Sequence, residues 1–197
     1  MEDFSSADFL ARLPGPVSPA SRQFYALWHG WRRGRRLPER RDLDLRALGH
    51  FHIVLELHNR DDIRIASIGP GLRLALGFDL TGHNYLDITN SENRSLRARL
   101  FIEQALQPCG SIVYYALRYA DGGVLPVECA GAPFCDDDGS GLVSLMAGCC
   151  TPLVPPRDND AIDPDSWLVG EGMRFIDLGF GIPPADPSTP RHMLPAF

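Results

Sequence analysis

The chain contains no lysine and no long apolar run. Its 19 arginines are outnumbered by acidic residues, and the net charge of -6 argues against a general affinity for nucleic acid. No stretch approaches the roughly 20 apolar residues that cross a bilayer, and the N-terminus lacks the basic and apolar segments of a secretory signal. We therefore expect a cytoplasmic protein with no membrane span and no nucleic-acid partner.

Cysteine and histidine patterns typical of metal sites are also missing. The five cysteines include no CxxC pair, and a chain of 197 residues can bury a core without disulfides, which indicates reduced thiols. Cys149 and Cys150 have no neighbouring cation to activate them and are better explained as small buried hydrophobes. His50, His52 and His58 share one strand parity but are too widely spaced to converge on one ion. We assign no metal.

Motifs for nucleophilic or nucleotide chemistry are absent as well. There is no GxSxG elbow, and Ser140 falls in an acidic turn. The GPG at 69–71 matches neither a phosphate-binding loop nor a dinucleotide fingerprint. We expect a protein that is not an enzyme, with a small hydrolase or thiol enzyme as the less favoured alternative.

The first expected element is a helix that begins at Pro19 and stops at Gly34. Ser18 is a suitable N-cap, and proline is well tolerated at the first helical position. Four large apolar residues fall on one face of this helix and need cover, either from the sheet or from a second copy of the chain. They are Phe24, Leu27, Trp28 and Trp31.

Strand patterns follow in two groups. Runs at 51–57 and 63–69 are rich in β-branched and aromatic residues and predict a hairpin. Runs at 111–120, 124–134 and 142–150 are separated by DGG and DDDGSG, which favour tight turns. The second group therefore predicts an antiparallel meander of three strands.

A longer helix is expected between the two strand groups, after short helices interrupted by glycine. Thr89 and Glu92 form a capping box, and Pro108 ends the helix near residue 107. Its residues expected toward the core are Leu96, Leu100, Phe101 and Ala105.

One domain is expected, because 197 residues are too few for two ordinary domains by default. Residues 1–18 are predicted to be a flexible arm, and residues 19–153 a domain that includes the N-terminal helix. Residues 154–197 are rich in proline and aspartate and form a C-terminal extension in which only 167–180 can pack.

This order of elements predicts an α+β fold with a five-stranded antiparallel sheet. The first strand lies beside the last, and the short helices cover one face. Both faces of the 111–120 strand are apolar, so the N-terminal helix is expected on the other face. A dimer surface on that face is the alternative.

The chain contains five motifs in a fixed order. They are a tryptophan-bearing helix, a basic Gly-Arg-Pro stretch, an Asp-x-Asp pair, a hydrophobic strand and a Gly-x-Asp-x-Thr-Gly turn. The positions are Trp28, Gly34, Pro38, Asp42, Asp44, 52–57, Gly69, Gly77, Asp79, Thr81 and Gly82. In these motifs, over residues 20–153, the chain resembles the PAS-like domain family of short alphaproteobacterial proteins, which consist of a stand-alone PAS domain. Pro70 departs from the family pattern, which has threonine there. The resemblance implies a PAS-like fold and a sensory or regulatory role.

A PAS-like fold implies a pocket between the sheet and the longer helix. Apolar residues there either line a cavity or fill a core, and a filled core is the commoner outcome. The helix offers no histidine for haem and no cysteine for a flavin adduct, so the cofactor stays unknown. The candidate pocket residues are Ile65, Leu72, Leu76, Tyr85, Phe101, Tyr115 and Cys129.

The expected function is that of a signalling adaptor that binds a small apolar or amphipathic ligand or a protein partner. A module without an effector domain must act through another protein, and a homodimer is expected. The alternative is a structural homodimer whose core is closed and binds no ligand. Fold alone does not decide between them.

Overall fold

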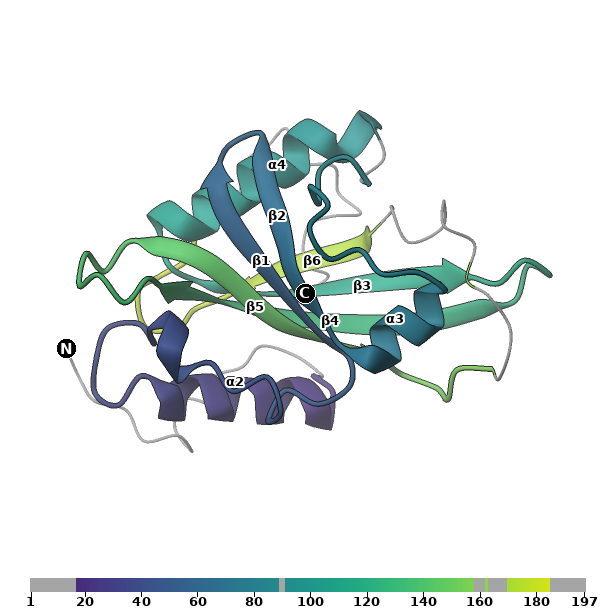
Figure 1. Ribbon diagram of the computed structural model, residues 1–197, viewed down its shortest axis with the longest axis horizontal. Coiled ribbons are helices and arrows are strands. Elements are labelled where there is room, and N and C mark those ends of the chain that lie inside the picture. Colours follow the sequence, from purple (N-terminus) through teal and green to yellow (C-terminus); the bar gives the residue numbers. More distant parts are fainter. Residues whose placement is uncertain (1–16, 89–90, 158–161, 163–169, 185–197) are drawn as a thin grey trace.

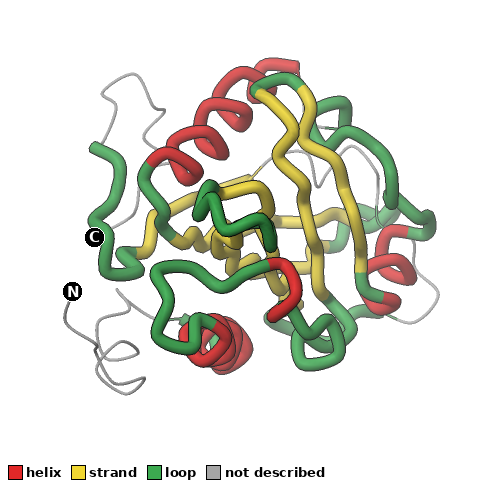
Figure 2. The backbone as a smooth tube through the Cα atoms, turned by 60° about the vertical axis from the view of Figure 1, so that its left-hand side comes forward, coloured by secondary structure: helices red, strands yellow, loops and turns green. Residues whose placement is uncertain are grey.

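The computed structural model describes residues 17–88, 91–157, 162 and 170–184, in which six strands form one antiparallel sheet. Helix α2 lies on one side of the sheet and α4 on the other (Figure 1, Figure 2). In the described part of the chain, no helix is long and apolar enough to span a membrane. The elements are α2 (Pro19–Trp31), η1 (Arg40–Asp42), β1 (His52–Asn59), β2 (Asp62–Ile68), α3 (Pro70–Leu76), α4 (Ser91–Leu106), β3 (Gly110–Arg118), β4 (Val124–Cys135), β5 (Val143–Pro152) and β6 (Gly170–Ile176).

The strand order is β2-β1-β5-β4-β3-β6. The first strand therefore pairs with the last strand of the meander, as the sequence predicts. Because side chains alternate along each strand, two distinct faces result. One face packs under α2, and the other packs under α3 and α4.

The prediction of five strands is wrong by one, because β6 adds a sixth strand beside β3. Met173 pairs with Val113, and Arg174 pairs with Ile112. The segment 167–180 was expected to pack, but its proline-rich surroundings gave no sign that it would join the sheet. The predicted domain limit at 153 stays a prediction, although part of the C-terminal extension belongs to the sheet. The predicted arm and the Thr89 cap lie almost wholly outside the described residues.

Helix α2 begins as expected and ends earlier. The Ser18 hydroxyl accepts a hydrogen bond from the Ser21 N–H at 3.2 Å, and Pro19 occupies the first turn. The helix ends at Trp31 instead of Gly34, because Arg33 and Gly34 both adopt positive φ values, 49° and 80°.

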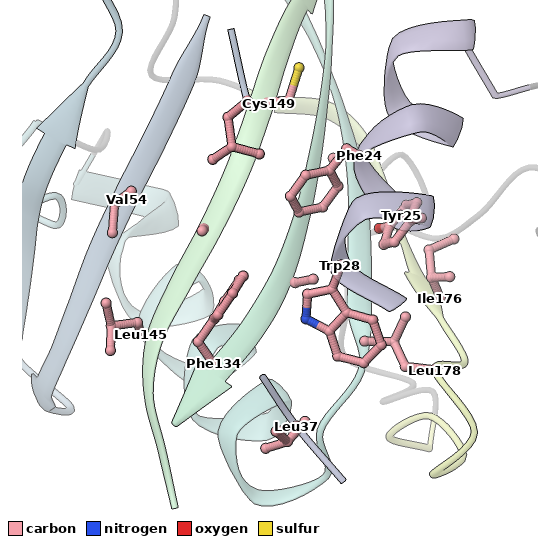
Figure 3. Packing of buried hydrophobic residues seen from close by; sticks show 14 of the residues in the cluster. Phe24, Tyr25, Trp28, Leu37, Val54, Phe134, Leu145, Cys149, Ile176 and Leu178 are labelled. Carbon is pink, nitrogen blue, oxygen red and sulfur yellow. The ribbon is translucent and has the colours of Figure 1, made fainter. Parts of the chain in front are cut away.

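The apolar face of α2 packs on β4 and β5 within the same chain (Figure 3). Phe24 and Trp28 are buried, and the Trp28 indole Nε1 donates a hydrogen bond to the Pro133 carbonyl at 2.9 Å. Trp31 is half-buried, and the centroid of its ring lies 6.0 Å from that of the Phe134 ring. Leu27 is also half-buried. These four residues thus lie on the helix that covers the sheet, and their role in a dimer stays a prediction.

Tyr25 completes this interface and was not among the predicted residues. Its hydroxyl donates to the carbonyl of Ser111 at 2.9 Å and lies 3.2 Å from that of Gly131, so it bridges β3 and β4. A side chain at Gly110 would come within 2.8 Å of the Tyr25 ring, so only glycine leaves room for it. The close approach of α2 to the sheet depends on this glycine.

The arginine-rich stretch after α2 is held by nearby carboxylates. Asp42 is buried, accepts a hydrogen bond from the Glu39 N–H at 2.9 Å and pairs with Arg35. Arg41 pairs with Glu39. The Asp42 position of the Asp-x-Asp motif is thus a structural anchor for the loop that leads to β1.

Candidate functional site

A cavity of about 130 Å³ lies between α4 and the sheet. Its walls come from α3, α4 and the sheet face turned away from α2. The side chains that line it are mostly aliphatic or aromatic. The expectation of a filled core is therefore wrong at this place.

Six of the seven predicted pocket residues line this cavity, and Ile65 does not. Ile65 is fully buried in the cluster beneath β1 and β2, where its side chain fills the core. The Tyr85 and Phe101 rings meet edge to face with centroids 5.5 Å apart. The six that line the cavity are Leu72, Leu76, Tyr85, Phe101, Tyr115 and Cys129.

Two paired glycines help to explain why the sheet leaves space under α4. Gly131 on β4 and Gly148 on β5 are register partners, and both border the cavity. A Cβ at Gly148 would lie 2.4 Å from the Ala130 carbonyl oxygen, so no larger residue fits. Neither position sends a side chain toward α4, so at these two positions the cavity is bordered by backbone.

Arg97 on α4 brings a positive charge into the cavity wall. Its side chain is 8% exposed, and its Nη1 donates to the hydroxyl of Tyr115 at 2.7 Å and to that of Tyr85 at 3.0 Å. Its guanidinium carbon lies 5.4 Å from the Tyr115 ring centroid, a cation–π distance. No acidic side chain among the described residues pairs with it, and its Nε is buried without a hydrogen-bond partner.

The charge on Arg97 is retained despite its burial. Burial by itself lowers the pKa of the guanidinium, but the Tyr115 and Tyr85 hydroxyls outweigh burial and leave the pKa above its ordinary value. Burial also raises the pKa of Tyr115 well above the ordinary value, so this hydroxyl keeps its proton. The cavity therefore holds a permanent cation beside a neutral hydroxyl.

Gln104 lies on the same face of α4, seven residues after Arg97. It is 2% exposed and lines the cavity. Its Nε2 donates to the Leu100 carbonyl at 3.3 Å, whereas its Oε1 has no hydrogen-bond partner. Rotating the amide by 180° would place Oε1 against that carbonyl, so Nε2 is the atom that faces Leu100 and Oε1 stays buried without a partner.

The opposite face of β3 and β4 carries a second polar cluster. Glu128 is 2% exposed and accepts hydrogen bonds from the Ser18 N–H at 3.0 Å and the Ser21 hydroxyl at 2.6 Å. Burial raises the pKa of Glu128, but hydrogen bonds from Ser18, Ser21 and Tyr114 outweigh it, so the pKa is lowered. This carboxylate anchors the N-terminus of α2.

The two clusters are connected by neighbouring residues. Tyr114 and Tyr115 point to opposite faces of β3, and Glu128 and Cys129 do the same on β4. Tyr114 and Glu128 are register partners. The sheet therefore places the cavity and the α2 anchor back to back.

The Cys129 thiol at the cavity is not activated. Burial raises the pKa of the Cys129 thiol well above its ordinary value, and contact with Cys150 raises it further. Within the described ranges, no three histidine, cysteine or acidic side chains are grouped to hold an ion.

The architecture has the first strand beside the last meander strand, the connecting helices on one face and a cavity beneath the longest of them. The fold is PAS-like. No protein-family model and no curated protein matches the chain.

Solved structures with a partial likeness include light-oxygen-voltage and PAS domains. A light-oxygen-voltage domain studied with a flavin analogue is 15% identical, with a TM-score of 0.40 over 56% of this chain and 82% of that chain. The PAS domain of an HTR-like protein from Haloarcula marismortui is 16% identical, with a TM-score of 0.35 over 55% and 88%. An RNA-binding light-oxygen-voltage receptor is 14% identical, with a TM-score of 0.40 over 75% and 47%.

Arg97 and Gln104 are the site residues that the sequence interpretation missed. Neither is among the residues expected toward the core, which are all apolar. The available signal was their spacing. Residues seven apart lie on the same helical face, and this pair flanks Leu100 and Phe101, which were expected to face the core.

Proposed function

We propose that this chain is a sensory or regulatory module of the PAS type that binds one small amphipathic molecule in the cavity beneath α4. The observation that carries the proposal is the cavity itself, with apolar walls and the buried Arg97 guanidinium. Mostly apolar walls with a few converging polar groups are the usual composition of small-molecule sites.

Binding is favoured over catalysis by the state of the groups in the wall. A nucleophile needs a lowered pKa or an adjacent base, whereas the pKa values of Cys129 and Tyr115 are both raised by burial. Arg97 does not exchange its proton near neutral pH. These groups suit holding a ligand in place.

The proposed route to a protein partner runs through the sheet to α2. A ligand that shifts Tyr115 also moves Tyr114, its neighbour on β3. Tyr114 contacts Glu128, which holds the start of α2. Occupancy of the cavity would thus change how firmly α2 is docked, and α2 would present that change to a partner.

Native mass spectrometry of the chain purified from its own host tests ligand binding. We expect a retained small molecule that is lost in Gly131→Val, because the added side chain occupies the cavity floor. A chain that retains no molecule and gains no thermal stability from a metabolite library would contradict the proposal and favour the structural homodimer. Co-purification tests the adaptor role, which fails if no partner is recovered and light scattering shows a monomer.

A further inference from the structure

The polar groups of the cavity allow the ligand to be described by class. Of the described residues that line the cavity, Arg97 is the only charged one. A buried cation without a counter-ion is unfavourable in apolar surroundings, and a bound anion would relieve this. The cavity is therefore electrostatically matched to a ligand with a single negative charge.

A carboxylate fits Arg97 better than other anions. The guanidinium presents its donors in a planar fork that matches the two oxygens of a carboxylate. A phosphate dianion would leave one negative charge uncompensated beside the apolar wall. The protonated Tyr115 hydroxyl lies 2.7 Å from Nη1, within reach of a group bound there.

The volume and Gln104 describe the rest of the molecule. A cavity of about 130 Å³ is close to the size of one that accommodates a benzene ring. Gln104 follows Arg97 by two helical turns, about 10 Å along the axis. Its Oε1 is buried without a hydrogen-bond partner, and a hydroxyl or N–H group of a ligand would supply one.

We propose that the ligand is a small carboxylate with an apolar body of about one ring, bound through its carboxylate to Arg97 and through a donor at its far end to Gln104. This inference rests on the proposed function, since it names the class of molecule that the cavity takes. Leu100 and Phe101 lie between the two polar residues on α4 and contact the apolar body.

Calorimetric titration of the full chain with benzoate, benzamide and 4-hydroxybenzoate tests the inference. Benzoate and benzamide have nearly the same shape and differ in charge. We expect benzoate to bind about ten-fold or more tightly than benzamide, because charge-assisted hydrogen bonds are stronger than neutral ones. 4-Hydroxybenzoate should bind more tightly than benzoate, and Gln104→Leu should remove that difference.

Variants on α4 separate a local effect from a change in overall charge. Arg97→Gln should weaken benzoate binding by about ten-fold or more while leaving benzamide binding nearly unchanged. Arg94→Gln is the matched control, because it removes one arginine from the same helix. The Arg94 side chain pairs with Asp87 outside the cavity. If Arg97→Gln does not fold, Arg97→Lys must keep the preference for benzoate, because it keeps the charge.

The outcomes distinguish this inference from the proposed function. Equal binding of benzoate and benzamide, or an uncharged molecule retained by the host-purified chain, overturns the carboxylate and leaves small-molecule binding intact. A carboxylate retained by the host-purified chain supports the inference. If no probe binds and no molecule is retained, the proposed function fails together with the inference.

Discussion

Replacing Glu128 by alanine measures how strongly α2 is held on the sheet. The carboxylate is 2% exposed and accepts hydrogen bonds from the Ser18 N–H and the Ser21 hydroxyl. A hydrogen bond to a charged group contributes about 1.5–3 kcal/mol. Alanine also removes the desolvation cost of the buried charge, and this gain offsets part of the energy of the two lost hydrogen bonds. We expect the free energy of unfolding to fall by about 3 kcal/mol, or about 6–12 °C in Tm for a chain of this length.

Glu128→Gln is the conservative control. The amide keeps the shape and one oxygen acceptor but loses the charge, so we expect a loss of about 1–2 kcal/mol. Urea unfolding at pH 7, followed by tryptophan fluorescence and circular dichroism, measures both variants. A loss below about 0.5 kcal/mol in Glu128→Ala would refute the anchoring role.

The pH dependence of stability provides a second check on Glu128. Its folded pKa is lowered, whereas an unfolded glutamate titrates near about 4.3. The stabilising contribution is therefore complete above the unfolded pKa and is lost as the pH falls through the folded pKa. The stability difference between the native chain and Glu128→Gln should be constant from about pH 7 to 5 and shrink below about pH 4. A difference that does not change with pH contradicts the assignment.

Three further predictions concern other parts of the chain. Burial raises the pKa of the Cys109 thiol to about 12. Its alkylation by iodoacetamide at pH 8, measured by peptide mass spectrometry, should therefore be about a hundred-fold or more slower in the folded chain than in urea. Equal rates would contradict this. Trp28→Phe removes the donor to the Pro133 carbonyl and leaves a void, so urea unfolding should show a loss of about 2–3 kcal/mol, and an unchanged midpoint would argue against this packing. Truncation after Arg157 removes β6 and exposes the edge of β3, so light scattering should detect association, and a stable monomer would show that this edge needs no cover.

Local signals were sufficient to predict the order of the strands. Alternating apolar residues and the DGG and DDDGSG turns specify the meander β3–β5, and Asn59 to Asp62 mark the β1–β2 turn. The N-terminal helix was predictable because Ser18 and Pro19 are strong start signals and its tryptophans require cover. These features depend on residues close together in the sequence.

Features that depend on distant partners were not predictable. β6 becomes a strand because β3 offers an unpaired edge, and nothing within Gly170–Ile176 alone specifies that pairing. The cavity depends on Gly131 and Gly148 lying side by side under α4, which requires the register of β4 and β5. Arg97 escaped notice because an arginine on a helix is usually solvated, and only the fold shows which face it occupies.

The cavity and Arg97 together support the proposed ligand-binding role. The apolar walls of a cavity of about 130 Å³ lack the packing contacts of a filled core, which lowers stability. A buried guanidinium without a counter-ion lowers it further. A ligand that binds only the folded state adds stability in proportion to the logarithm of its concentration over Kd. One small anion in the cavity would therefore offset both terms.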